Sequence, residues 1–186
     1  MVKRIFAEKD YAEVSPAYVR GGVQYYFLRV DPQPFKDGRV IAIEEVYDHE
    51  PAQADKDALY AAWLAMEKSV KVAEIVVYDI TDAVNVFEIN GMRAWLDKAT
   101  RVGLQNSLRV EKEAGHETST LYLNGVAFVL PIDEALGMLA ELELYAVGCY
   151  QQTEAHKAAV NAYTSIEDVI AYDYTQGYPE HPVFNV

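Results

Sequence analysis

The stretch "STLYLNGVAFVL", residues 119–130, reads as a complete β-hairpin. Asn124 and Gly125 form the dipeptide that best suits a two-residue type I′ turn, because both central residues of that turn have positive φ. Counting outward from the turn predicts three cross-strand pairs, which are Leu123–Val126, Tyr122–Ala127 and Leu121–Phe128. The first and third pairs share one face of the predicted hairpin, and the second pair lies on the other face.

A second Asn-Gly hairpin, "NVFEINGMRAWL", lies upstream at residues 85–96. Counting from its turn predicts the pairs Ile89–Met92, Glu88–Arg93 and Phe87–Ala94. The middle pair brings opposite charges together across the strands, which contributes a few tenths of a kcal/mol (~0.2–1). The other two pairs are apolar, so this hairpin also has one face suited to a core.

Two helices follow the hairpins. Asp97 stands at the start of the first, which runs to a predicted stop at Gly115. The second, residues 132–163, is a long run of good helix formers, and its second half is rich in alanine. Ser165 is then placed to cap a short helix through its position before Asp168, and a short strand or extended end follows. The order is that of one β-β-α-β-β-α module with a long C-terminal helix.

The first part of the chain reads differently. Residues 22–30 and 38–48 are rich in aromatic and β-branched residues, and the stretch between them, 31–38, has turn chemistry. Pro51 opens a helical pattern. We therefore predict an α+β protein of two parts: an N-terminal strand-rich unit with one helix, residues 1–77, and the hairpin-helix-hairpin-helix module, residues 78–186.

Composition excludes several classes of protein. The formal net charge is −13, and the sequence shows no local basic patch, so we expect no nucleic-acid and no membrane-surface partner. No apolar run reaches the roughly 20 residues of a membrane span, and the start of the chain lacks the apolar core of a signal peptide. Cys149 is the single cysteine, which fits a reducing compartment.

The sequence offers no constellation typical of catalysis. His116 stands in a helix-to-strand connection, and His156 stands beside Glu154 on the long helix, where we expect a solvated pair. Cys149 lies in the apolar half of that helix, where burial makes a thiol inert. We predict no catalytic residues, no cofactor and no metal ligand, and so no enzyme. An enzyme would need a pocket in which one of these three groups meets a charged partner.

The tyrosines are the most unusual feature of the composition, with 14 in 186 residues. In "AYDYTQGYP", residues 171–179, Tyr172 and Tyr174 alternate with Asp173 and should face one side of an extended segment. Gly177 permits a turn that brings Tyr178 to the same side. These three tyrosines either cap the helices of their own chain or form an exposed patch that binds a partner, and they are the candidate partner interface.

Residues 82–182 resemble a domain of unknown function found in phage and prophage tail-fibre and tail-assembly proteins. The shared features are a helix bearing Arg101 and Asn106-Ser107, a short hairpin, a long alanine-rich helix and the close "YDYTQGYP". Many relatives have a tryptophan-and-aspartate turn between the helices, and "LYLNG" replaces it here. The resemblance implies a bacterial virion or virion-assembly component with no catalytic residues, located in the host cytoplasm, in the virion or in both, and not exported by a signal peptide.

We therefore expect a non-enzymatic, phage-derived structural or assembly protein that acts through contacts with other proteins. Its partners would be tail or baseplate proteins, and it is a possible homo-oligomer. The alternative is a small-molecule or glycan-binding module that uses tyrosine-rich surfaces.

Overall fold

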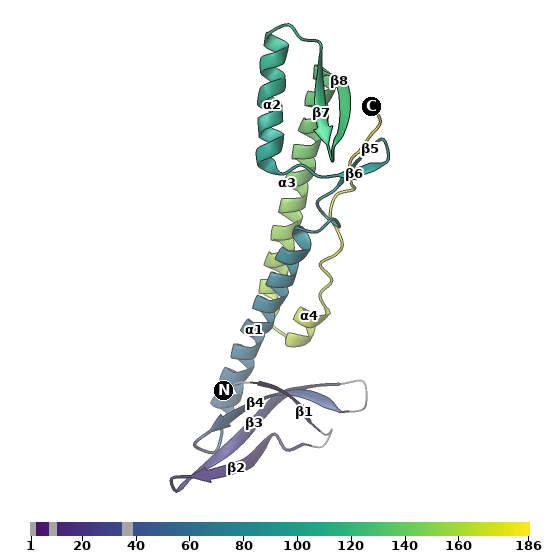
Figure 1. Ribbon diagram of the computed structural model, residues 1–186. Helices are drawn as coiled ribbons and strands as arrows, with labels where there is room; N and C mark the ends of the chain where they lie inside the picture. The colour runs from purple at the N-terminus through teal and green to yellow at the C-terminus, as the bar shows by residue number, and fades with distance from the viewer. Residues whose placement is uncertain (1–2, 8–10, 35–38) are drawn as a thin grey trace. The chain divides into compact units, whose positions relative to one another are not determined.

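The computed structural model describes residues 3–7, 11–34 and 39–186 and confirms the α+β class, with four helices and a strand-rich N-terminal region. The chain divides into two compact units (Figure 1). The first contains Met1–Val70 and Tyr163–Ala171, and the second contains Lys71–Ala162 and Tyr172–Val186. The helix α1 (Gln53–Asp79) runs through the division. The boundary predicted between residues 77 and 78 therefore falls inside a helix, and residues 163–171 return to the first unit.

The first unit contains a four-stranded antiparallel sheet with the order β1-β4-β3-β2. Its strands are β1 (Lys3–Ala7), β2 (Val14–Arg20), β3 (Val23–Pro34) and β4 (Val40–Tyr47). The two central strands, β3 and β4, match the strands predicted at 22–30 and 38–48, and β1 and β2 add an edge on each side.

The turn predicted at 31–38 is wrong over its first half, because β3 continues to Pro34. The pairing of β3 with β4 shifts register between Val30 and Gln33, and Asp31 takes a positive φ of 53°. This irregularity lets the strand pass the Asp-Pro pair and continue. Residues 35–38 of the predicted turn lie outside the described residues.

The core of the first unit lies between the sheet and the helices. Leu28 and Ile43 of the sheet pack with Leu59 and Trp63 of α1, and the short helix α4 (Ile166–Ala171) adds Ile166. All five are at most 5% exposed. Ser165 caps the first turn of α4 as expected, because its hydroxyl oxygen accepts from the amide of Asp168 at 3.1 Å.

Both predicted hairpins are confirmed in register. The strands β5 (Phe87–Ile89) and β6 (Met92–Ala94) pair as counted from the sequence, and so do β7 (Thr118–Leu123) and β8 (Val126–Pro131). Their turn residues Asn90, Gly91, Asn124 and Gly125 all have positive φ, as a type I′ turn requires. The guanidinium of Arg93 donates to the carbonyl of Asp82 at 3.2 Å.

Two helices complete the second unit: α2 (Lys98–Glu113) and α3 (Ile132–Ala162). The carboxylate of Asp97 accepts from the amide of Thr100 at 2.7 Å, which lowers the pKa of that carboxyl and caps α2. Gly115 takes a φ of 87° just after α2, as the predicted stop requires. The last strand, β9 (Val183–Phe184), pairs parallel with β5.

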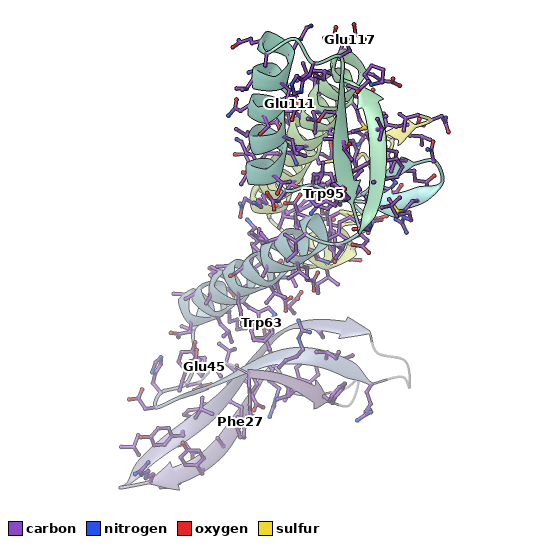
Figure 2. All side chains as sticks on the ribbon, turned by 45° about the horizontal axis from the view of Figure 1, so that its top comes forward. Phe27, Glu45, Trp63, Trp95, Glu111 and Glu117 are labelled. Atoms are coloured by element: carbon purple, nitrogen blue, oxygen red, sulfur yellow. The ribbon has the colours of Figure 1, made fainter. Side chains whose placement is uncertain are left out.

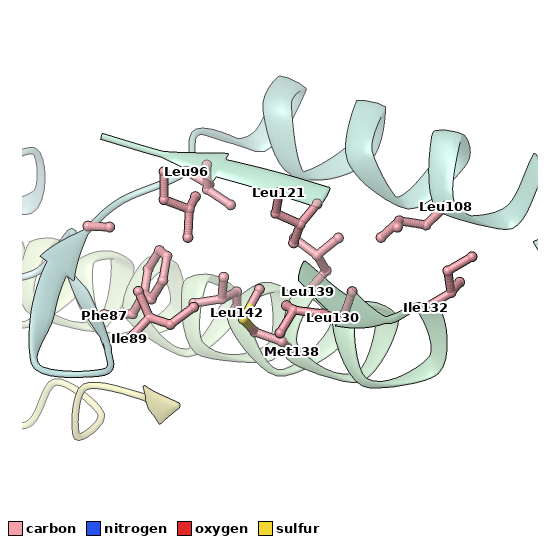
Figure 3. Packing of buried hydrophobic residues seen from close by; sticks show 13 residues of the cluster. Phe87, Ile89, Leu96, Leu108, Leu121, Leu130, Ile132, Met138, Leu139 and Leu142 are labelled. Carbon is pink, nitrogen blue, oxygen red and sulfur yellow. The ribbon is translucent and has the colours of Figure 1, made fainter. Parts of the chain in front are cut away.

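The core of the second unit lies where the inner faces of the hairpins meet α3 and α2 (Figure 3). Its fully buried members include Phe87 and Ile89 from β5, Leu139 and Leu142 from α3, and Leu108 from α2. The β7–β8 hairpin contributes the inward residues of its alternating pattern, so its opposite face is turned away from this core. That division of the hairpin into two faces decides which of its side chains a partner can reach.

Candidate functional site

The three candidate tyrosines converge on helices of their own unit. The hydroxyl of Tyr172 lies 2.7 Å from Nδ1 of His156 on α3. The ring of Tyr174 meets the ring of Tyr78 on α1 edge-on, with centroids 5.6 Å apart. The ring of Tyr178 lies 5.7 Å from that of Tyr78. The three tyrosines thus contact α3 and α1, and all three side chains are half-buried.

The solvated pair predicted for His156 and Glu154 is wrong. His156 is 4% exposed, and the carboxylate of Glu154 instead accepts from Lys157 at 2.7 Å. Nε2 of the imidazole lies 2.9 Å from the carbonyl oxygen of Gln176 and 3.0 Å from the side-chain amide of Gln152, and we assign it as the donor to the carbonyl, because a carbonyl can only accept. Nδ1 then accepts from the hydroxyl of Tyr172. Helical position alone did not reveal that the C-terminal segment covers this part of α3.

A second set of hydrogen bonds joins the C-terminal segment to α3 and also reaches α1. The hydroxyl of Thr153, 2% exposed, donates to the carboxylate of Asp79 at 2.6 Å. The hydroxyl of Tyr178 lies 3.1 Å from the same threonine oxygen, and it is the donor there because the threonine proton is already committed to the carboxylate. Burial raises the pKa of the Tyr178 phenol. The C-terminal segment is thus held by two directed hydrogen-bond chains.

Cys149 is buried, as predicted, and burial raises the pKa of its thiol. A hydrogen bond between its side chain and Tyr145 acts against burial and lowers the pKa of the thiol, whereas the negative charge of Asp79 acts in the same direction as burial. The phenol of Tyr145 donates to the carbonyl of Val84 at 2.5 Å, and its pKa is also raised, chiefly by burial. Burial and a raised pKa both favour the protonated, less reactive form of a thiol.

Arg101 is a buried cation that the helical pattern did not identify as a core residue. It is 4% exposed, and its guanidinium contacts the carboxylate of Glu143 at 2.9 and 3.0 Å. It also donates to the carbonyl of Leu96 at 2.6 Å and lies over the ring of Trp95. All of these contacts are made with other residues of the protein, and through them Arg101 ties the start of α2 to α3.

The remaining histidines lie at the surface. His116 is exposed in the connection between α2 and β7. His49 lies between the carboxylates of Asp48 and Asp55, at 3.0 and 3.3 Å, and these two hydrogen bonds raise the pKa of its imidazole. Within the described residues, no group of three histidine, cysteine or acidic side chains is arranged to hold a metal ion, and none of the helices there has the length and hydropathy to cross a bilayer.

The outer face of the β7–β8 hairpin is exposed and apolar. Tyr122 is 74% exposed and Val129 is 68% exposed, and the neighbours on this face are Thr120 and Ala127. Neither strand contains a charged residue. Glu117, labelled in Figure 2, is the last charged residue before β7. In the part of the chain that the structure describes, no further strand pairs with either edge of this hairpin.

The first unit contains a separate cavity of about 300 Å³ beside Trp63, which Figure 2 labels at α1. Its apolar lining includes Ile43 from β4 and Ile166 from α4, and charged side chains complete it. The guanidinium of Arg4 lies over the Trp63 ring, 5.3 Å from its centroid, and is paired with the buried carboxylate of Glu67. None of the candidate tyrosines lines this cavity.

No protein-family model matches the sequence, and the comparisons with curated proteins and with solved structures returned no match. The geometry described above therefore carries the functional argument.

Proposed function

We propose that this protein is a non-enzymatic structural or assembly protein that acts through protein–protein contacts, and that a second copy of the chain binds at the β7–β8 hairpin by pairing its β8 strand with the open β8 edge, which joins the outer faces of the two hairpins into one surface. The observation that carries the proposal is the charge-free hairpin surface, on which Tyr122 and Val129 are more than two-thirds exposed. Exposed apolar surface of this kind marks interaction sites in soluble proteins. A bare two-stranded ribbon with open edges also favours pairing with another chain.

Charge restricts where a second copy can bind. Each chain has a net charge of −13, so two copies repel each other wherever their acidic surfaces meet. Neither strand of the hairpin contains a charged residue, so this repulsion is weakest where two hairpins meet. If two β8 strands pair antiparallel about Phe128, Val126 stands opposite Leu130 and Ala127 opposite Val129, and like charges never face each other. A surface that matches itself in this way suits a two-fold interface.

The proposed setting is a phage or prophage tail. It is supported by the resemblance of residues 82–182 to a domain of tail-fibre and tail-assembly proteins, and self-association is the property that a component present in many copies needs. Neighbouring genes that encode tail or baseplate proteins would support this setting, and an operon of metabolic genes would contradict it.

The test is the molar mass by light scattering at two protein concentrations. We expect the wild-type mass to rise above that of one chain, 20.9 kDa, as the concentration increases. The double variant Tyr122→Lys/Val129→Lys places charges on the hairpin surface and should stay at the mass of one chain. Both positions are exposed, so the substitutions should leave the melting temperature within a few degrees of the wild type.

Val110→Lys is the matched control, because Val110 is also an exposed apolar residue, 65% accessible, on α2 of the same unit. It should associate as the wild type does. A wild-type mass that stays at one chain at both concentrations would contradict the proposal, and so would equal association of the wild type and the double variant.

A further inference from the structure

The second unit contains a polar pocket of about 230 Å³. Four polar side chains from three separate segments line it: Asp82, Asn85, Arg93 and Asn124. Trp95, labelled in Figure 2, and two smaller apolar side chains complete the lining. Every residue of this unit belongs to the described part of the chain. The volume is below the roughly 300–1,000 Å³ of sites for drug-sized ligands, so the pocket suits a ligand of about one six-membered ring.

Backbone carbonyls fix the orientation of both asparagine amides in the pocket. Nδ2 of Asn124 donates to the carbonyl of Arg93 at 3.1 Å, and Nδ2 of Asn85 donates to the carbonyl of Asp79 at 2.8 Å. Because a carbonyl can only accept, these bonds assign the nitrogen and the oxygen of each amide. Neither side-chain oxygen has a hydrogen-bond partner among the described residues. Both oxygens are therefore available to accept from a ligand.

The free oxygen of Asn124 is not a general property of its place in the turn. Asn90 stands at the same position of the β5–β6 turn, with a φ of 49° against 50° for Asn124. Its Nδ2 donates to the carbonyl of Val186 at 2.9 Å, and its Oδ1 accepts from the amide of the same residue at 3.0 Å. One turn thus uses both ends of its asparagine amide within the chain, whereas the other leaves an acceptor free at the pocket.

The two charged side chains of the lining add both kinds of hydrogen-bonding group. The guanidinium of Arg93 donates to the carbonyl of Asp82 at 3.2 Å, which uses one of its five N–H groups. The exposed carboxylate of Asp82 accepts no hydrogen bond from the described residues. A charged ligand of either sign would meet a like charge in this lining. A hydroxyl group both donates and accepts, so it can bond to any of the four polar side chains.

We propose that this pocket binds a neutral sugar ring. Its hydroxyl groups donate to the oxygens of Asp82, Asn85 and Asn124 and accept from the guanidinium of Arg93. Its C–H groups lie against the part of the half-buried Trp95 ring that lines the pocket, where they leave water. The proposal concerns the second unit alone and does not depend on association through the β7–β8 hairpin. None of the three candidate tyrosines lines the pocket, so this site differs from the tyrosine-rich surface expected from the sequence.

The test is NMR titration of the isotope-labelled full chain with the methyl glycosides of glucose, galactose and mannose. The side-chain amide signals of Asn85 and Asn124 report on the pocket. We expect at least one glycoside to shift both signals to saturation. Cyclohexanol has a ring of the same size with one hydroxyl group, and β-alanine is a zwitterion that could pair with Asp82 and Arg93, and each should bind more weakly. The proposal is overturned if no glycoside shifts the two signals, or if either comparison compound binds as tightly as the best glycoside.

A matched pair of glycine variants tests the location of the site, with the Asn85 signal as the readout. Asn124→Gly removes the side chain, and glycine retains the positive φ of the turn. It should weaken glycoside binding about two- to tenfold, the range for one neutral hydrogen bond. Asn90→Gly makes the same change at the other turn, outside the pocket, and should leave the affinity unchanged. Equal affinities of these two variants would contradict the location.

The carboxylate is tested separately by Asp82→Ala. It should weaken glycoside binding about tenfold or more, because a hydrogen bond to a charged group contributes more than a neutral one. Glu117→Ala removes another exposed carboxylate of the same unit that does not line the pocket, and it should bind as the wild type does. Wild-type affinity in Asp82→Ala, or an equal loss in Glu117→Ala, overturns the proposal.

Discussion

The hydroxyl of Tyr172 lies 2.7 Å from Nδ1 of the buried His156, sixteen residues earlier in the chain. This contact and the bond from Nε2 to the carbonyl of Gln176 use both nitrogens of the imidazole. The C-terminal segment therefore supplies a partner to each nitrogen, in addition to the side-chain amide of Gln152 on α3, which lies 3.0 Å from Nε2. Buried polar groups are costly unless they are hydrogen-bonded, so the segment and the histidine stabilise each other.

Tyr172→Phe removes the hydroxyl and leaves Nδ1 of His156 without its donor. We expect the free energy of unfolding to fall by about 1–3 kcal/mol, the cost of an unsatisfied buried polar atom. Urea denaturation followed by circular dichroism measures it. Tyr122→Phe is the control, since that tyrosine is 74% exposed and its substitution should have almost no effect. Equal stability of the two variants would show that the Tyr172 hydroxyl contributes nothing.

Tyr174→Ala distinguishes the two roles predicted for the C-terminal tyrosines. The ring contacts Tyr78 and lies under the ammonium group of Lys71, 5.6 Å away in each case, but it is only half-buried. We expect the free energy of unfolding to fall by about 1–2 kcal/mol. This loss is more than the roughly 0.5–1.5 kcal/mol that an aromatic pair alone contributes, and it is less than the loss on truncating a fully buried core ring. An unchanged melting temperature would favour a role in binding a partner. Tyr150→Ala, at a position 63% exposed, is the control.

Cys149 should resist thiol reagents in the native protein. Reaction with 5,5′-dithiobis(2-nitrobenzoate) at pH 8 should be slow, because the thiol is buried and its pKa is raised, and it should become fast in concentrated urea. The ratio of the two rates reports how rarely this part of α3 opens. Rapid reaction of the native protein would show instead an accessible thiol and would contradict this expectation.

His49 should titrate above the ordinary histidine value of about 6.5, because its two nitrogens bond to the carboxylates of Asp48 and Asp55. A raised folded-state pKa means that the stabilisation is fully present below pH 6.5 and is lost as the pH rises through the folded-state value. Proton NMR of the imidazole measures the pKa. Asp48→Asn should lower it, and a midpoint unaffected by this substitution would contradict the assignment.

The hairpins could be predicted down to individual residue pairs because their register is a local property. An Asn-Gly turn fixes which residues stand opposite each other, and the same holds for the cap at Asp97, which involves residues three apart. The strand β1 was not predicted as a separate element, because its pairing with β4 joins residues about forty positions apart. The turn predicted at 31–38 failed at Asp31, where a bulge carries the strand past a sequence that favours a turn.

The environment of the candidate site could be predicted only in part. Alternation predicts that Tyr172 and Tyr174 face one side of the segment, and this stays a prediction, whereas their contacts with His156 and Tyr78 come from the structure. The burial of His156 depends on contacts with Tyr172 and Gln176 from a different segment, and helical periodicity carries no information about them. The cavity beside Trp63 likewise requires β1, β3, β4, α1 and α4 together, so no local pattern could reveal it.

Hydrogen exchange of the β7–β8 amides at two protein concentrations tests most directly whether copies of the chain meet at this hairpin. Along an antiparallel strand, every second residue directs its amide away from the partner strand. In β8 these include Ala127 and Val129, whose amides point away from β7 and should exchange quickly in dilute solution. At high concentration we predict that both become protected, in the wild type and in Val110→Lys but not in Tyr122→Lys/Val129→Lys. Rapid exchange of both amides in a sample whose mass shows association would place the contact elsewhere and contradict the account.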